Sequence, residues 1–265
     1  MRDNVTRQMI TALIALVVLC LLLAITPTQD PLKVAFDDRL AAPNVGHWLG
    51  TDDLGRDMLS RVVKGAALTI SVSIAALLSS LAIGVVIGAG AGYFYKSWPD
   101  RVFCWVADFV TAVPFVVLIA SLLSLTGPGV LKAYIVLTGI IWVSPARIVR
   151  AEVIKTLPLE YVLAERALGA PEWRILFFTV TPACVSTAVL FSVGYLPEII
   201  ALEAGLSFLG LGVQPPQPSL GKMIFDGIGH IGSAWWIAVF PAATLFFIVL
   251  AVQSVAWGAR ARAAS

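Results

Sequence analysis

Charged residues are scarce in this chain of 265 residues. Asp, Glu, Lys and Arg together make up 13% of the sequence, whereas a soluble domain has about 25%. Apolar residues make up 59%, above the roughly 45–50% of soluble domains, and they occur in long blocks. So few charges cannot keep such a surface dissolved. This excludes a soluble globular enzyme and indicates a membrane protein.

Cysteine and histidine are also rare, and their positions exclude several kinds of site. The three cysteines, Cys20, Cys104 and Cys184, are isolated within apolar stretches, and no C-x-x-C pair exists. We therefore expect buried small side chains rather than a disulfide framework or a zinc site. His47 and His230 are widely separated, so they form no metal constellation, and no metal site is predicted.

Sequence signatures of nucleic-acid binding and of ATP binding are missing. The net charge is only +2 and the basic residues are scattered, so no nucleic-acid partner is expected. The G-x-x-x-x-G-K-[ST] loop that cradles ATP phosphates is absent, so any energy from ATP must come from another chain. No nucleophile or metal cluster lies within the apolar blocks, so the chain itself is not expected to be an enzyme.

The apolar blocks predict an all-α membrane protein with six spans. A span needs about 20 mostly apolar residues to cross a core of roughly 30 Å. The six predicted spans are residues 9–25, 66–95, 102–125, 130–149, 176–202 and 234–258. The chain then has three parts: an N-terminal span with an external stretch (1–65), a core of five spans (66–258) and a short tail (259–265).

Lys and Arg residues predict the orientation. Eleven of the 18 fall on the side of the N-terminus and seven on the other, which favours cytoplasmic positions for both ends of the chain. The first apolar run follows Arg2 and Arg7, as a cleaved signal peptide would. No small-x-small cleavage site follows the run, so we expect an uncleaved span anchoring an external stretch of about 40 residues.

That external stretch ends in a polar segment, residues 47–61, just before the second span. Leu54, Met58 and Val62 recur every fourth residue among charged neighbours, which predicts a short helix lying at the membrane surface. The close aspartates do not follow the pattern of a calcium-binding loop. Within the second span, Gly84, Gly88 and Gly92 form a row of small residues where another helix can approach closely.

Residues 155–174 form a loop that is too apolar for solvent. Thr156 is a candidate helix cap, Gly169 a candidate helix stop, and Pro171 with Glu172 a candidate start of a second helix. The predicted helix, about residues 157–168, carries two apolar stripes. One comprises Leu159, Val162, Leu163 and Ala167, and the other Tyr161, Ala164 and Leu168. Such a helix is expected to be buried on two sides, against the chain's own spans or in a partner.

This loop resembles the cytoplasmic coupling motif of ATP-binding-cassette (ABC) importer permeases. The family form is Glu-Ala-Ala, three residues, Gly, nine residues, then Ile-x-Leu-Pro. Aligned on Gly169, this chain agrees at Ala164, Gly169 and Pro182. It departs at Leu163, Glu165, Thr179 and Thr181.

Three further features are similar to the dipeptide, oligopeptide and nickel branch of that family. Residues 47–61 look like its signature before the second span, and residues 203–216 like its signature after the fifth. Asp108 and Pro114 stand where the branch has an acid and a proline. The resemblance runs from about residue 47 to 250, and the C-terminal tail departs from the branch.

The resemblance implies a permease subunit of an ATP-driven importer in the bacterial inner membrane. Its partners would be a homologous second permease, two ATP-binding subunits that hold ATP and Mg, an external or lipid-anchored solute-binding protein, and membrane lipid. The residues implied in coupling to the ATPase are Glu160, Tyr161, Leu163, Ala164, Glu165, Arg166, Ala167, Gly169, Ala170 and Pro182. The solute would be a peptide, nickel, a metal chelate or a related molecule.

Three acids within predicted spans are candidates for the translocation pathway. Asp108 lies two turns after Arg101 near the cytoplasmic end, which also fits a structural pair. Glu198 and Glu203 lie toward the outer end of the fifth span, where a hinge beside Pro197 or plain packing are the alternatives. A secondary transporter or channel-like protein working without an ATPase is the alternative function. It would carry charges at mid-bilayer and related halves, and neither is evident.

Overall fold

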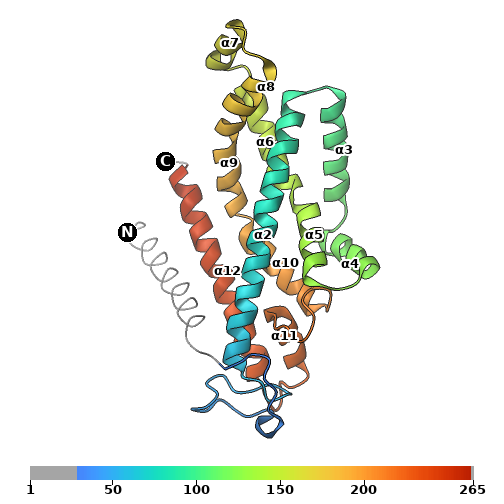
Figure 1. Ribbon diagram of the computed structural model, residues 1–265, viewed down its shortest axis with the longest axis vertical. Helices are drawn as coiled ribbons and strands as arrows, with labels where there is room; N and C mark the ends of the chain where they lie inside the picture. Colours follow the sequence, from blue (N-terminus) through green and yellow to red (C-terminus); the bar gives the residue numbers. More distant parts are fainter. Residues whose placement is uncertain (1–28, 264–265) are drawn as a thin grey trace. The chain divides into compact units, whose positions relative to one another are not determined.

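The computed structural model describes residues 29–263, and within this range the secondary structure is helical. A lone bridge between Thr51 and Asp57 is the single pairing of extended backbone there. The prediction of an all-α protein is confirmed. The helices, labelled in Figure 1, are η1 (Phe36–Asp38), α2 (Met58–Tyr93), α3 (Trp98–Ala112), α4 (Phe115–Thr126), α5 (Val130–Ile141), α6 (Val143–Thr156), α7 (Glu160–Ala167), α8 (Glu172–Arg174), η2 (Ile175–Val180, a π-helix), α9 (Thr181–Val193), α10 (Leu196–Phe208), α11 (Leu220–Ile228) and α12 (Trp236–Ala263).

Four helical stretches among the described residues are long and apolar enough to cross a membrane. They are Met58–Tyr93, Val130–Thr156, Glu172–Val193 and Trp236–Gly258, and they overlap four of the predicted spans. The predicted third span is broken, since α3 and α4 meet at an angle of 91°. The predicted first span, residues 9–25, lies outside the described residues, so the count of six and the side of each terminus remain predictions.

Two predicted spans are interrupted, the third at Pro114 and the fifth at residues 194–195. Pro114 forces Val113 into an extended conformation (φ −86°, ψ 133°), which ends α3 and splits the third span. α9 ends at Val193, and Pro197 lies in the first turn of the separate helix α10. The predicted fifth span is therefore too long. Glu198 and Glu203 belong to α10.

The prediction of a surface helix before the second span is wrong. Apart from η1 and the bridge between Thr51 and Asp57, residues 30–57 form turns and loops, and Met58 begins the 36-residue helix α2, which continues without a break to Tyr93. At 1.5 Å per residue α2 is about 54 Å long, more than the roughly 30 Å hydrocarbon core, so part of it extends beyond the membrane. Met58 and Val62 are buried in a protein core rather than facing lipid.

Two compact units make up the chain. Among the described residues, the first comprises residues 29–74, 120–134 and 196–263, and the second residues 75–119 and 135–195. In the first unit, α10, α11 and α12 pack on a core that includes Met58, Ile200, Leu220 and Ile237. The indole nitrogen of Trp236 donates to the backbone oxygen of Thr51 at 3.0 Å, which ties the segment before α2 to α12.

In the second unit, the C-terminal half of α2 packs against α6 along the predicted row of glycines. A Cβ atom added at Gly84 would lie 2.8 Å from Pro145, and one at Gly92 would lie 2.8 Å from the backbone oxygen of Arg150. One added at Gly88 would overlap the backbone oxygen of Ala146. The expected close helix approach is confirmed, and α6 is the helix that makes it.

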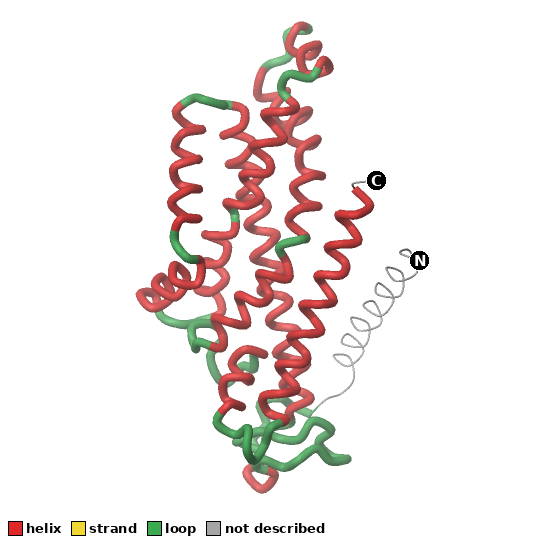
Figure 2. The backbone as a smooth tube through the Cα atoms, turned by 180° about the vertical axis from the view of Figure 1, so that it is seen from behind, coloured by secondary structure: helices red, strands yellow, loops and turns green. Residues whose placement is uncertain are grey.

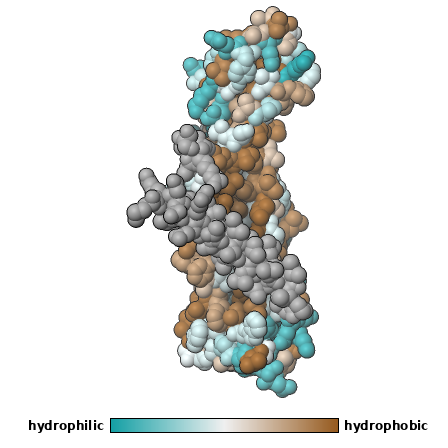
Figure 3. Space-filling model, turned by 90° about the vertical axis from the view of Figure 1, so that its left-hand side faces the viewer, coloured by the Kyte–Doolittle hydropathy of each residue, from teal (hydrophilic) through white to brown (hydrophobic). Residues whose placement is uncertain are grey.

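The hydropathy of the surface agrees with a membrane setting. Figure 3 shows hydrophilic side chains gathered over α7 and α8 in the second unit and over residues 30–57 in the first, whereas the long helices carry mainly apolar side chains. On α12, Phe246 is 59% exposed and Trp257 is 71% exposed. A water-soluble monomer rarely exposes such a continuous apolar surface, so these helices are suited to lipid or to neighbouring subunits.

Candidate functional site

The candidate site is a short helical hairpin formed by α7, the turn after it and α8. Figures 1 and 2 show that this hairpin lies beyond the ends of α6 and α9, at the tip of the second unit. α7 is shorter than predicted: it begins at Glu160 after the N-cap residue Leu159. Thr156 is the last residue of α6 and is buried, so it does not cap α7 as predicted.

Gly169 makes the turn of the hairpin. Its φ angle is +80°, in the left-handed region that glycine adopts without steric cost. The backbone N–H of Ala170 donates to the oxygen of Glu165 at 3.1 Å, and that of Gly169 to the oxygen of Arg166 at 3.1 Å. These bonds satisfy carbonyl groups that the end of a helix leaves free. The predicted helix stop is confirmed.

The apolar side chains of α7 do not share one environment. Val162 is fully buried and packs in a cluster with Val149, Val153 and Ile175. The remaining large apolar side chains near α7 are exposed: Leu159 by 45%, Tyr161 by 47%, Leu163 by 47% and Leu168 by 87%. One side chain therefore anchors α7 to the chain's own helices, and the other large apolar side chains keep about half or more of their surface exposed.

Polar side chains of the hairpin are engaged within the second unit. The Arg166 guanidinium binds both carboxylate oxygens of Glu172, with Nε–Oε1 at 2.7 Å and Nη2–Oε2 at 3.0 Å. The hydrogen bond to Glu172 raises the pKa of Arg166 above its ordinary value. The Tyr93 hydroxyl at the end of α2 also donates to Glu172. The Thr179 hydroxyl of η2 donates to the Glu165 carboxylate at 2.8 Å.

The structure brings most of the predicted coupling residues into this hairpin. Glu160, Ala164 and Ala167 are exposed on α7, and Ala170 is half-buried in the turn. Pro182 is separate from them, since it lies in the first turn of α9 after the π-helix. Tyr93 was not predicted as a site residue, because nothing in the sequence indicates that the end of α2 meets the hairpin.

The three acids proposed for a pathway lie in different surroundings. Asp108 pairs with Arg147 at 2.8 Å rather than with Arg101, and its side chain is 77% exposed. Glu203 is 2% exposed and accepts a hydrogen bond from Ser207 at 2.9 Å, an environment that fits the packing alternative. Glu198 is exposed in the first turn of α10.

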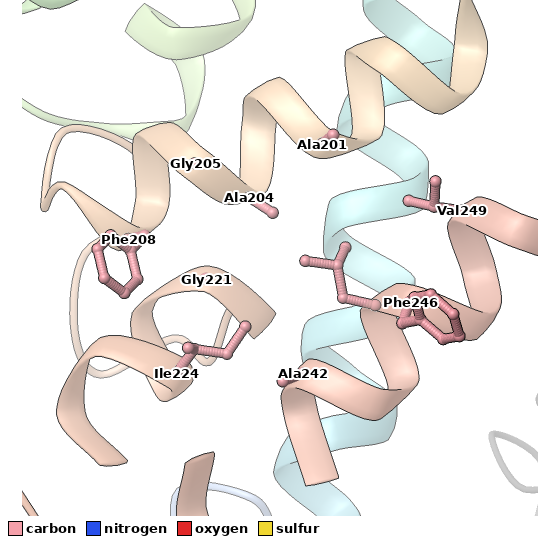
Figure 4. A pocket seen from close by; sticks show the side chains of 10 residues that line it. Ala201, Ala204, Gly205, Phe208, Gly221, Ile224, Ala242, Phe246 and Val249 are labelled. Carbon is pink, nitrogen blue, oxygen red and sulfur yellow. The ribbon is translucent and has the colours of Figure 1, made fainter. Parts of the chain in front are cut away.

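Neither a metal site nor a polar pocket accompanies the hairpin among the described residues. No group of three or more potential metal ligands occurs between residues 29 and 263, where His47 is instead bonded to Asp57 at 3.0 Å. A cavity of about 440 Å³ lies between α10, α11 and α12 (Figure 4). Its lining is entirely apolar: Ala201, Ala204, Gly205, Phe208, Gly221, Ile224, Ala242, Leu245, Phe246 and Val249. Such a cavity has no side chain with which to bind a charged solute.

The hairpin lies within a stretch of the chain that matches a known protein family. The family described as "Binding-protein-dependent transport system inner membrane component" matches residues 84–256, which include α7, α8 and the helices that follow. The chain belongs to this family. The predicted resemblance to ABC importer permeases is confirmed, and with it a multi-pass protein of the inner membrane.

Individual relatives of this permease agree with the family. The glutathione transport system permease protein GsiD of Pectobacterium atrosepticum is 36% identical over 226 residues, covering 84% of this chain and 74% of the relative. The dipeptide transport system permease protein DppC of Alkalihalophilus pseudofirmus is 33% identical, covering 84% and 73%. The MetNI methionine ABC transporter contains a chain of similar fold, with a TM-score of 0.62, 19% identity and coverage of 77% of this permease and 97% of that chain.

Proposed function

We propose that this permease forms half of the pathway for uptake of a peptide or a related small solute. Support comes from relatives named as glutathione, dipeptide and oligopeptide permeases, which are 32–36% identical over 84–85% of the chain. A homologous second permease would complete the pathway, and an external solute-binding protein would deliver the solute. Nickel or a metal chelate is the alternative cargo.

The exposed apolar surface of α7 is the observation that carries the coupling proposal. We propose that Tyr161, Leu163 and Leu168 dock on an ATP-binding subunit, which holds ATP and Mg, while Val162 keeps α7 attached to this chain. A partner that covered these side chains would remove roughly 25 cal/mol per Å² of apolar surface from water. The positive φ of Gly169 supports this proposal, because the turn sets the direction in which α7 is presented.

Co-purification tests the docking surface. A tagged permease purified from its native membranes is expected to retain an ATPase, and Leu163→Asp is expected to lose most of it, because a buried unpaired charge is costly. Val34→Asp is the matched control, since Val34 is 43% exposed but lies before α2, in the first unit. Retention of the ATPase by Leu163→Asp would contradict docking through α7.

The proposed orientation places the hairpin in the cytoplasm. An alkaline phosphatase fusion after Ser219 is expected to be active, because phosphatase folds outside the cytoplasm, and a fusion after Glu160 is expected to be inactive. The reverse pattern would contradict the orientation while leaving family membership unaffected.

A further inference from the structure

A single carboxylate, that of Glu172, joins three elements of the second unit. It belongs to α8, it binds Arg166 of α7 through both of its oxygens, and it accepts a hydrogen bond from Tyr93 at the end of α2. These residues are far apart in the sequence, since Tyr93 precedes Glu172 by 79 positions. The contact therefore attaches the hairpin to α2, a helix that is distant from it in the sequence.

The Glu172 contact contributes little to the stability of the fold. The Arg166 and Glu172 side chains are 41% and 49% exposed, and exposed ion pairs contribute little to stability. A bidentate pair between a guanidinium and a carboxylate does, however, fix direction, because both groups are planar and two bonds must align. The geometry thus suits orientation of α7 better than stabilisation of the fold.

The end of α2 that receives this contact is itself held firmly. Gly92, the residue before Tyr93, approaches α6 so closely that an added Cβ would lie 2.8 Å from the oxygen of Arg150. Arg150 in turn binds Asp100 of α3 through Nε at 2.5 Å and Nη2 at 3.0 Å. A displacement of the backbone at this end of α2 is therefore expected to shift α6 with it, because the two helices are in close contact at Gly92.

We propose that Glu172 is a positioning residue that clamps α7 to the end of α2, so that movement of α7 displaces α2. This inference rests on the proposed coupling role of α7 and adds the route by which movement leaves the hairpin. Tyr93 and Arg166 are the other two members of this Glu172 clamp. Without the clamp, α7 still docks on its partner and stays attached through Val162, but its direction relative to the end of α2 is no longer fixed by the Glu172 contact.

The test uses the complete transporter in proteoliposomes, with solute uptake and ATP hydrolysis measured together. Glu172→Gln and Tyr93→Phe keep the shape of their side chains and remove the charge or the hydroxyl. We expect both variants to assemble and to hydrolyse ATP, with uptake per ATP reduced by about three- to tenfold. The double variant should lose less than the sum of the two single losses, because both changes weaken the same three-residue contact.

A charge exchange and a control separate positioning from folding. Arg166→Glu combined with Glu172→Arg restores the ion pair, and the Tyr93 hydroxyl can accept from the new guanidinium, so uptake per ATP should recover over either single change. Glu152→Gln breaks an exposed pair with Lys155 (2.9 Å) within α6 and should leave the ratio unchanged.

Two results would overturn the clamp: an unchanged ratio in Glu172→Gln, or a decline explained entirely by loss of assembled complex. A failure of the proposed function is distinct from both, since the unaltered permease would then show no associated ATPase.

Discussion

Replacing Gly169 should destabilise the turn after α7 by an amount that depends on the residue introduced. Gly169 has a φ of +80°, and a Cβ atom built on it meets nothing within 4 Å. The cost of a side chain at this position is therefore a backbone cost alone. For alanine it is about 1–2 kcal/mol, which corresponds to a roughly 5- to 30-fold loss in the population of the turn. Valine should cost more because its branched Cβ restricts the backbone further, and asparagine less because it tolerates the left-handed region.

The order of effects can be measured in two ways. Amide hydrogen exchange of the hairpin in the purified transporter should quicken in the order Asn, Ala, Val, since each variant opens the turn more often. Uptake per ATP hydrolysed should fall in the same order, while the amount of permease inserted in the membrane stays constant. Gly90→Ala is the control, because Gly90 lies in α2 with ordinary helical geometry and open space around it.

The prediction is wrong if the volume of the side chain at residue 169, rather than the backbone conformation, determines the loss of coupling. If Gly169→Asn is as damaging as Gly169→Val, volume rather than backbone geometry determines the effect, and the turn is pressed against another surface. Normal coupled transport by Gly169→Val would show that the geometry of this hairpin is not required for coupling.

Two further predictions concern stability. Gly88→Ala should destabilise the permease by about 1–3 kcal/mol through overpacking against Ala146, whereas Gly90→Ala should be neutral or slightly stabilising, as thermal unfolding in detergent would show. Asp52→Asn should cost about 3 kcal/mol or more. It removes the charge from a buried carboxylate that binds Arg56 at 2.7 Å and Arg61 at 3.2 Å, and an unchanged unfolding temperature would contradict that role.

Much of this fold could be predicted because apolar blocks and small-residue spacing are local signals. The row of glycines in α2 indicated a close helix neighbour, and the stop at Gly169 indicated the turn, since both depend on a missing side chain. The identity of the neighbour, α6, could not be predicted. That depends on which distant helix fits the groove, and no local pattern encodes it.

The predicted span boundaries are wrong where an apolar stretch of sequence continues across a break between two helices. Hydropathy is unchanged across Pro114 and across residues 194–197, so a rule based on composition joined separate helices there. α11, capped by a hydrogen bond from the backbone N–H of Lys222 to the Ser219 hydroxyl at 3.2 Å, was missed because its nine residues are too short to count as a span. Boundaries of this kind are set by backbone geometry rather than by the amount of apolar surface.

The structure accounts for two of the positions at which this chain differs from the family's coupling motif. The family form places alanine and isoleucine where this chain has Glu165 and Thr179, and taken singly each change weakens the resemblance. In the structure these two side chains are bonded to each other at 2.8 Å, the hydroxyl donating to the carboxylate. Either change alone would leave a half-buried polar group without this partner, whereas both together give each polar group a hydrogen-bond partner. Because the two side chains are partners in one hydrogen bond, the departures are better understood as one change at a contact than as two separate losses from a motif.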